Sequence, residues 1–353
     1  MGQHQSRRKH LSIAQPSQRM PSVVVIGGAK GACSIIEGLN RLLVIIKSVV
    51  SMSDNGGHTG LCRREHDVHP GGDVRRLLAA HAARNLKRNS GSTLVSQLLE
   101  FRFSQPGSHV DNCSLGNFLM LAVESLAGDF QRGINLLEEL LCIPIGSVIP
   151  VTLTQNNLVG QLADGTVIFG ETNLDVPKHD ASIAIAKTWL EPAAAANPKA
   201  VEAIMGADVV LLGPGDLYTS IVPNGLVAGI PEAIAATSAK VVYISNIMTK
   251  HGETNGYKLS DFMRVIGQLF GGLDAIDMVF ANDGTPPADQ LLRYRDEGQE
   301  LVEIDPKAYH LGPEIITGNF LCNDDNKLAR HDSLSVVELI KEILFPELEL
   351  MYA

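Results

Sequence analysis

The sequence predicts an α/β protein built on a doubly wound, mostly parallel sheet. Short apolar, β-branched runs, of which residues 23–26 are the first, alternate with stretches of helical periodicity. Glycine-rich turns follow several of these runs. In addition, 45% of the residues are hydrophobic and 19% are charged, a balance that supplies a large core and excludes global disorder.

The first unit is a strand, a glycine turn, a helix and a second strand. The strand at residues 23–26 leads into a Gly-Gly-Ala-Lys-Gly turn. Apolar residues at helical spacing then predict a helix over 33–42, and a β-branched strand follows at 44–52. The next block is helical, with helices expected at residues 74–87, 93–103, 115–126 and 132–141.

The second half returns to strands and begins with a hairpin. Residues 159–162 and 166–169 flank Asp164-Gly165, a favoured type I′ turn pair. An Ala-rich helix is expected at 193–203, and a helix running to about residue 236 after the Gly-Pro-Gly-Asp turn. The remaining predicted elements are strands at 209–212, 241–245 and 278–281 and a last helix at 336–344. Such alternation gives a Rossmann-like architecture, in which ligands sit beyond the strand carboxyl ends.

The length of 353 residues fits about two domains of roughly 150 residues, or one large domain with insertions. We expect a disordered tail at residues 1–21 and a single α/β domain at 22–345. Within that domain, about 60–145 forms a helical insertion. Residues 346–353 form a C-terminal tail.

The charge and the cysteines limit the function classes. A net charge of −10 gives no overall attraction for nucleic acid or anionic lipid, so a phosphate-bearing ligand must be held by local groups. Five widely spaced cysteines without zinc-type spacing indicate packed thiols in a reduced compartment. No run of about 18 apolar residues occurs, so we expect a cytoplasmic protein without a membrane span. Homo-oligomerisation stays open.

The first glycine loop is a candidate anion site. Gly27, Gly28 and Gly31 allow close approach of a phosphate to the start of a helix, where unpaired N–H groups and the helix dipole favour negative charge. Lys30 adds a cation. The loop lacks the G-x-G-x-x-G pattern, which disfavours an NAD-type oxidoreductase, and a tight strand-to-helix turn is the plain alternative.

The second loop, Ser53-Asp54-Asn55-Gly56-Gly57, ends the second strand. Asp54 is placed to grip a ribose hydroxyl, as in dinucleotide folds, or to bind Mg²⁺ beside phosphate oxygens. An Asx-turn, with Asp54 bonded to its own backbone, explains the residue without a ligand.

Two further loops open helices. In Pro70-Gly71-Gly72-Asp73, Asp73 is expected at the N-cap, and Arg75 or Arg76 pairs with a ligand anion or a carboxylate because cations there oppose the dipole. The segment Gly213-Pro214-Gly215-Asp216-Leu217-Tyr218-Thr219-Ser220 offers hydroxyls beside N–H groups that could cradle a diphosphate.

Together these blocks resemble one family, the gluconeogenesis factors, a branch of the CofD-like proteins that also include 2-phospho-L-lactate transferase. The resemblance covers roughly residues 22–345. It rests on Val-Ile-Gly-Gly, Ser-Asp-Asn-Gly-Gly, Pro-Gly-Gly-Asp-Val-Arg and Gly-Pro-Gly-Asp-Leu-Tyr-Thr-Ser-Ile-x-Pro-Asn, with further matches at Gly116-Asn117, Gly170-Glu171, 246–254 and 330–332. The usual first loop of the family has a Thr where this chain has Lys30, and many members have two Asp where it has Asp54-Asn55.

The resemblance implies binding of a nucleotide sugar, of the UDP-N-acetylglucosamine type, in support of carbon metabolism, cell-wall precursor supply and cell shape. It implies that the first glycine loop faces the nucleotide and that Asn224 and Arg330 contact the nucleotide sugar. The alternative is a Mg²⁺-dependent transferase of a phosphorus-containing group, like 2-phospho-L-lactate transferase of deazaflavin coenzyme biosynthesis. Asp54 and Asp73 are then candidate catalytic residues and Asp54 the metal candidate. The expected ligand-binding residues are Gly27, Gly28, Lys30, Gly31, Asp54, Asn55, Gly56, Gly57, Asn117, Gly213, Gly215, Asp216, Tyr218, Thr219, Ser220, Asn224, Asn246 and Arg330.

Overall fold

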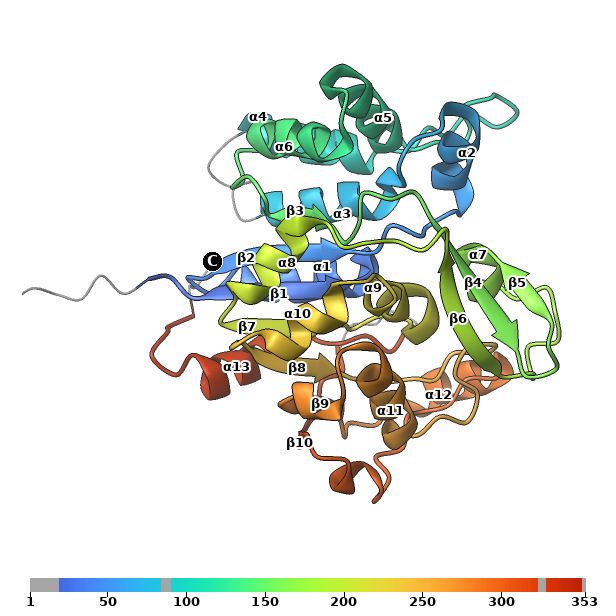
Figure 1. Ribbon diagram of the computed structural model, residues 1–353, viewed down its shortest axis with the longest axis vertical. Coiled ribbons are helices and arrows are strands. Elements are labelled where there is room, and N and C mark those ends of the chain that lie inside the picture. The colour runs from blue at the N-terminus through green and yellow to red at the C-terminus, as the bar shows by residue number, and fades with distance from the viewer. Residues whose placement is uncertain (1–18, 84–89, 323–327, 351–353) are drawn as a thin grey trace, which may run out of the picture.

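A seven-stranded parallel sheet forms the centre of the molecule (Figure 1). The computed structural model describes residues 19–83, 90–322 and 328–350. The strand order is β10-β9-β8-β7-β1-β2-β3. The strands are β1 (Ser22–Gly27), β2 (Ile45–Val50), β3 (Val148–Pro150), β7 (Val209–Leu212), β8 (Lys240–Ile244), β9 (Met278–Asn282) and β10 (Glu314–Gly318). The predicted Rossmann-like sheet is confirmed.

The central strands are apolar on both faces because helices cover both faces. Residues 23–26 of β1 and 210–212 of β7 are completely buried, which explains why their sequences show no alternation of apolar and polar residues. β1 pairs with β2 on one side and with β7 on the other. The winding of the chain therefore reverses between β1 and β7, and this switch point opens a crevice at the carboxyl ends of both strands.

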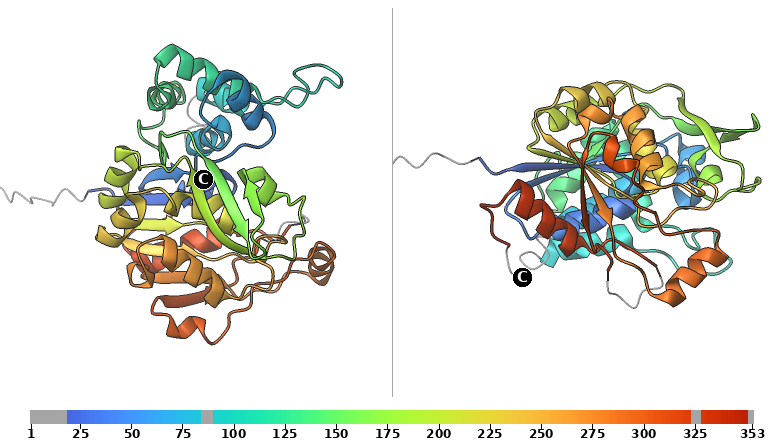
Figure 2. Two further views of the ribbon diagram at one scale, coloured as in Figure 1. Left: turned by 45° about the vertical axis from the view of Figure 1, so that its right-hand side comes forward. Right: turned by 90° about the horizontal axis from the view of Figure 1, so that it is seen from below.

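Two helix layers enclose the sheet. On one face lie α1 (Ala29–Leu39), α3 (Gly71–Ala82) and α13 (Ser333–Leu344), which contact one another through α1. On the other face lie α8 (Pro198–Met205) and α10 (Ile230–Ala236). The view from below in Figure 2 shows the sheet between these layers. Further helices are α9 (Val222–Gly225), α11 (Leu259–Leu269) and α12 (Ala288–Asp296).

Two additions flank the crevice. A helical lobe beyond β2 contains α2 (Gly57–His66), α4 (Ser90–Glu100), α5 (Leu115–Ala127) and α6 (Phe130–Leu140). A small antiparallel sheet of order β5-β4-β6 lies to one side (Figure 1). It comprises β4 (Asn157–Leu162), β5 (Val167–Phe169) and β6 (Ile185–Glu191), with the short α7 (Glu171–Asp175) between β5 and β6. The predicted hairpin is confirmed as β4–β5.

Three local predictions are wrong. The Ala-rich helix begins only at Pro198, because the Asn197 side chain caps it by accepting from the Lys199 N–H group. The helix expected to run to residue 236 is broken into a π turn at Leu217–Ile221, then α9 and α10. Asp73 is not the N-cap of α3, since that position is Pro70.

The terminal predictions fall mostly outside the described residues. Of the tail expected at 1–21, the structure describes 19–21, and of the tail at 346–353 it describes 346–350. The domain boundaries stay predictions. Within the described ranges, we find no helix with the length and apolar character that a bilayer span requires.

Candidate functional site

A cavity with a volume of about 660 Å³ lies at the switch point. It is lined by the loops after β1, β2 and β7, by the helical lobe and by α7. Many of the predicted ligand-binding residues line it, together with the candidate Asp73. These residues are Lys30, Gly31, Asp54, Gly56, Gly57, Asn117, Gly215, Asp216, Thr219 and Ser220.

The loops after β1 and β7 touch each other at glycines. A Cβ atom on Gly31 would lie 1.8 Å from the Pro214 carbonyl oxygen, and one on Gly28 would lie 2.7 Å from Ser220 Oγ. Gly213, at the end of β7, has a positive φ of 82°. Gly27, Gly28 and Gly213 do not line the cavity; they let the two loops pack together beneath it.

Three helices begin at the cavity, and in none of them does the N-cap residue itself cap the helix with its side chain. The N-cap residues of α1, α2 and α3 are Gly28, Gly56 and Pro70, and none has a side-chain hydrogen bond to its helix. First-turn residues of all three helices line the cavity. The Ala29 N–H group donates to Asp73 Oδ2 at 3.1 Å. Convergent helix N-termini make this wall favourable for anions.

Asp54 lies beside this wall, and one of its two carboxylate oxygens is already hydrogen-bonded within its own loop. Its Oδ1 accepts a hydrogen bond from the Gly56 N–H group at 2.9 Å, so the Asx-turn alternative is present. Burial and the charge of Asp73 raise the pKa of the Asp54 carboxyl, against the hydrogen bonds from Gly56 and Thr59. A buried carboxyl group whose charge is disfavoured by a neighbouring carboxylate favours a cation or a hydrogen-bond donor beside it.

Glu171 is a cavity residue that the sequence analysis noted only as part of a motif. Burial, followed by the charges of Asp54, Asp175 and Asp73, raises its pKa to about 8. A raised pKa favours the protonated form of this carboxyl group near neutral pH. Its Oε2 accepts a hydrogen bond from the Thr172 hydroxyl at 3.3 Å. Glu171 reaches the cavity on α7, whose Thr172 N–H group donates to Asn55 Oδ1 at 3.0 Å. Asn55 thus anchors α7 and is not itself a lining residue.

Positive side chains line the cavity on the side of the helical lobe. Arg75 is 2% exposed and donates to Asn117 Oδ1, to the Leu99 carbonyl and to Glu100. Arg76 pairs with Asp73 at 3.3 Å. The sequence predicted that one of these arginines pairs with a ligand anion or a carboxylate, and both pair with carboxylates. Lys30 and Arg102 also line the cavity.

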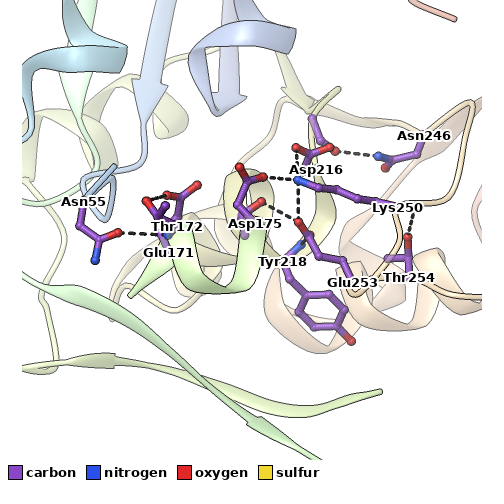
Figure 3. Close-up of polar contacts among 12 residues, drawn as sticks. Asn55, Glu171, Thr172, Asp175, Asp216, Tyr218, Asn246, Lys250, Glu253 and Thr254 are labelled. Carbon is purple, nitrogen blue, oxygen red and sulfur yellow. Dashed lines mark hydrogen bonds and ion pairs between the residues drawn. The ribbon is translucent and has the colours of Figure 1, made fainter. Parts of the chain in front are cut away.

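The π turn after β7 is held from below by a buried acid. Glu253 Oε2 accepts from the Tyr218 N–H group and Oε1 from the Thr219 hydroxyl, both at 3.0 Å (Figure 3). The Tyr218 hydroxyl lies 2.9 Å from that of Tyr257. The sequence suggested the hydroxyl and N–H groups of this segment for a diphosphate, but the Tyr218 N–H group and the Thr219 hydroxyl are already bonded to Glu253. Tyr218 does not line the cavity.

Three other predicted residues lie away from the cavity. Asn224 is fully buried; its amide donates to the Ser220 carbonyl at 2.9 Å and its Oδ1 is buried without a partner. The Asn246 amide donates to the Gly215 carbonyl at 2.8 Å. Arg330 is exposed near the start of α13. Direct ligand contact by these residues stays a prediction.

Several lining residues had no signal in the sequence. They include Arg102, Asn112, Thr172 and Asp175. Arg102 and Asn112 belong to an irregular segment between α4 and α5, and α7 follows a hairpin far along the chain. Only the tertiary fold brings these segments to the switch point.

Two groups of carboxylates are relevant to a metal ion. Asp54 and Asp73 supply the hard oxygen atoms that Mg²⁺ prefers, and such an ion would complete its shell with water or phosphate oxygens. In the described ranges, one set of three acids has carboxylate oxygens within 4.8 Å of one another, namely Asp175, Asp216 and Glu253. Its centre contains the ammonium group of Lys250.

Comparison with known proteins agrees with this architecture. Residues 23–321 match the family described as 2-phospho-L-lactate transferase CofD. A putative gluconeogenesis factor of Thermotoga maritima is 36% identical over 327 residues, covering 91% of this chain and 98% of the relative. The gluconeogenesis factor of Bacillus subtilis is 31% identical over 326 residues, covering 92% and 98%.

A solved structure shares the fold. The crystal structure of a Bacillus halodurans protein superposes with a TM-score of 0.83 at 35% sequence identity, covering 91% of this chain and 99% of that one. Sequence and fold therefore agree over nearly the whole described domain. This chain belongs to the CofD family, in the branch whose relatives are named gluconeogenesis factors.

Proposed function

We propose that this protein binds a nucleotide sugar of the UDP-N-acetylglucosamine type in the switch-point cavity. The observation that carries the proposal is the meeting of three helix N-termini, none capped by its own N-cap side chain, in one cavity of about 660 Å³. Anions are favoured at such N-termini, and the volume is within the usual range of roughly 300–1,000 Å³ for small-molecule sites. A diphosphate therefore fits this wall even though the chain is acidic overall.

The side of the cavity formed by α7 and the loop after β7 suits the sugar. Glu171, Asp175 and Asp216 line the side nearest the small sheet. Oxygen atoms of all three acids can accept hydrogen bonds from hydroxyl and amide groups, and those that are ionised repel phosphate oxygens. The two walls together support a ligand with phosphates at one end and hydrogen-bond donors at the other.

The names of the relatives suggest the cellular process in which the protein takes part. Proteins 31–37% identical to this chain are named gluconeogenesis factors. We propose that this protein, by binding its ligand, regulates carbon metabolism and the supply of cell-wall precursors, and so affects cell shape. Binding without turnover is sufficient for this role.

Calorimetric titration tests the proposal. We expect UDP-N-acetylglucosamine to bind and a Lys30→Gln variant to bind about 5- to 10-fold more weakly, since a charge-assisted contact contributes roughly 1 kcal/mol. Lys199→Gln, which removes an exposed lysine on the far face at α8, is the matched control and should bind normally. Absence of binding at millimolar ligand by the folded protein would reject the proposal.

A second candidate function is Mg²⁺-dependent transfer of a phosphorus-containing group, as in 2-phospho-L-lactate transferase. The adjacent Asp54 and Asp73 carboxyl groups favour it. These residues would hold the ion, which supplies charge neutralisation on a diphosphate. An Asp54→Asn variant should lose turnover and keep nucleotide binding. Preference for guanosine over uridine diphosphate carriers would also favour this candidate, while unchanged turnover would remove Asp54 from it.

A further inference from the structure

Lys250 joins three separate segments at the edge of the cavity (Figure 3). Its Nζ atom lies 2.7 Å from Asp216 Oδ2 and 2.9 Å from Glu253 Oε1, and it also contacts Asp175. Asp175 ends α7, Asp216 follows β7, and Glu253 belongs to the loop that carries Lys250 itself. One ammonium group therefore links the small sheet to two loops of the central sheet.

The surroundings of Lys250 favour the charged form of its ammonium group. Burial disfavours it, but the charges of Glu253 and Asp216 outweigh burial and raise the pKa of Lys250. Glu253 has no exposed surface, so removing its cationic partner would leave a buried carboxylate among two others. The three acids and the lysine depend on one another.

The lysine stands where a metal ion could stand. The carboxylate oxygens of the three acids lie within 4.8 Å of one another, a spacing that would also suit a bound cation. The ammonium group occupies this position, so the cluster of Lys250, Asp175, Asp216 and Glu253, called the lysine corner below, is held together by its own side chains.

The lysine corner includes or contacts residues that line the cavity. Asp175, Asp216 and Thr219 line it, whereas Lys250 does not. Glu253, held by Lys250, in turn fixes the π turn through the Tyr218 amide and the Thr219 hydroxyl. At the other end of α7, the Asn55–Thr172 hydrogen bond attaches the helix to the loop after β2.

We propose that Lys250 is a positioning residue of the ligand site, which holds α7 against the π turn and so sets the wall that receives the sugar. The inference rests on the proposed function for its choice of ligand. Without the ammonium group, the three carboxylates repel, α7 separates from the loop after β7, and the wall opens. The phosphate-binding side, built on α1–α3, remains.

Chemical rescue of a Lys250→Ala variant tests this role. Propylammonium is the fragment that the substitution removes. We expect K250A to bind UDP-N-acetylglucosamine at least tenfold more weakly than the wild type, and propylammonium at tens of millimolar to restore most of the affinity. UDP alone should bind both proteins within about threefold. Lys258→Ala, which breaks an exposed pair with Glu303, is the matched control and should show neither loss nor rescue.

Each other outcome decides the matter. Unchanged affinity of K250A, or a loss that propylammonium does not restore in the folded variant, overturns the inference. If K250A does not fold, Asp175→Asn replaces it, because this variant keeps the Lys250–Glu253 pair; normal sugar binding by D175N then overturns the inference. If the wild type binds no nucleotide sugar, the proposed function fails. The inference is then decided by whether propylammonium raises the Tm of K250A and not that of K258A.

Discussion

Replacing Gly31 by Ala should separate the two loops that form the base of the cavity. The new Cβ would lie 1.8 Å from the Pro214 carbonyl oxygen and 2.5 Å from its carbonyl carbon. Main-chain atoms cannot rotate away as a side chain can, so α1 or the loop after β7 must shift by more than 1 Å. Overpacking costs about 1–3 kcal/mol and occasionally more, and we expect a loss of about 3 kcal/mol here.

Gly27→Ala provides the matched control. A Cβ at Gly27 would meet its nearest neighbour at 3.7 Å, which is ordinary contact. Alanine is also favoured over glycine within a helix by about 1 kcal/mol, so a loss at Gly31, which lies in α1, has to come from the contact. Urea unfolding, with comparison of the m-values, measures both variants. Equal stability of G31A and G27A would refute the packing of these loops.

Three further predictions concern buried polar groups. Burial lowers the pKa of His81, which is hydrogen-bonded to Ser48, to about 4, so below pH 6.5 protonation of this group favours the unfolded state. His81 should account for about 2 kcal/mol of the stability lost between neutral pH and pH 5, while buried His331, whose pKa is also lowered to about 4, adds its own loss. Unfolding experiments should therefore show a fall about 2 kcal/mol smaller in His81→Gln than in the wild type, and an equal fall would contradict the assignment. Arg75→Met should lower the free energy of unfolding by about 2–4 kcal/mol in denaturant titration, because the buried oxygen acceptors of Asn117 and Leu99 lose their donor. A loss below about 0.5 kcal/mol would contradict these hydrogen bonds. The Glu138 carboxylate accepts hydrogen bonds from the N–H groups of Gly146 and Val148. Glu138→Gln should lower the free energy of unfolding by about 2 kcal/mol in the same assay, since one of these N–H groups then faces an amide donor. A stability equal to that of the wild type would contradict these hydrogen bonds.

The central sheet could be predicted from the sequence because its strands are buried on both faces. β1 and β7 are continuous apolar runs followed by glycines, so local sequence located both strands and the loops after them. That these two strands are neighbours, which makes the switch point, is known only from the sheet itself. The β4–β5 hairpin was equally readable from Asp164-Gly165. By contrast, β3 has three residues and includes Pro150, too short a pattern to distinguish from a loop.

The π turn could not be predicted, because its cause lies elsewhere in the chain. Its geometry depends on Glu253, more than 30 residues downstream, and on the Asn224 amide at the Ser220 carbonyl. The candidate site divides in the same way. Glycine turns and Asp54 have local signatures, whereas Asp175 and Lys250 are 75 residues apart and acquire a role only through their contact.

The anion-favouring wall of the cavity is made largely of main-chain amides at the starts of α1, α2 and α3, while the wall on α7 is made of side chains. Point substitutions rewrite side chains and leave peptide groups in place. If the protein binds a nucleotide sugar as proposed, a mutational library over residues 171–175 should therefore yield variants that prefer other sugars and still bind the diphosphate, so α7 is the segment in which to change selectivity.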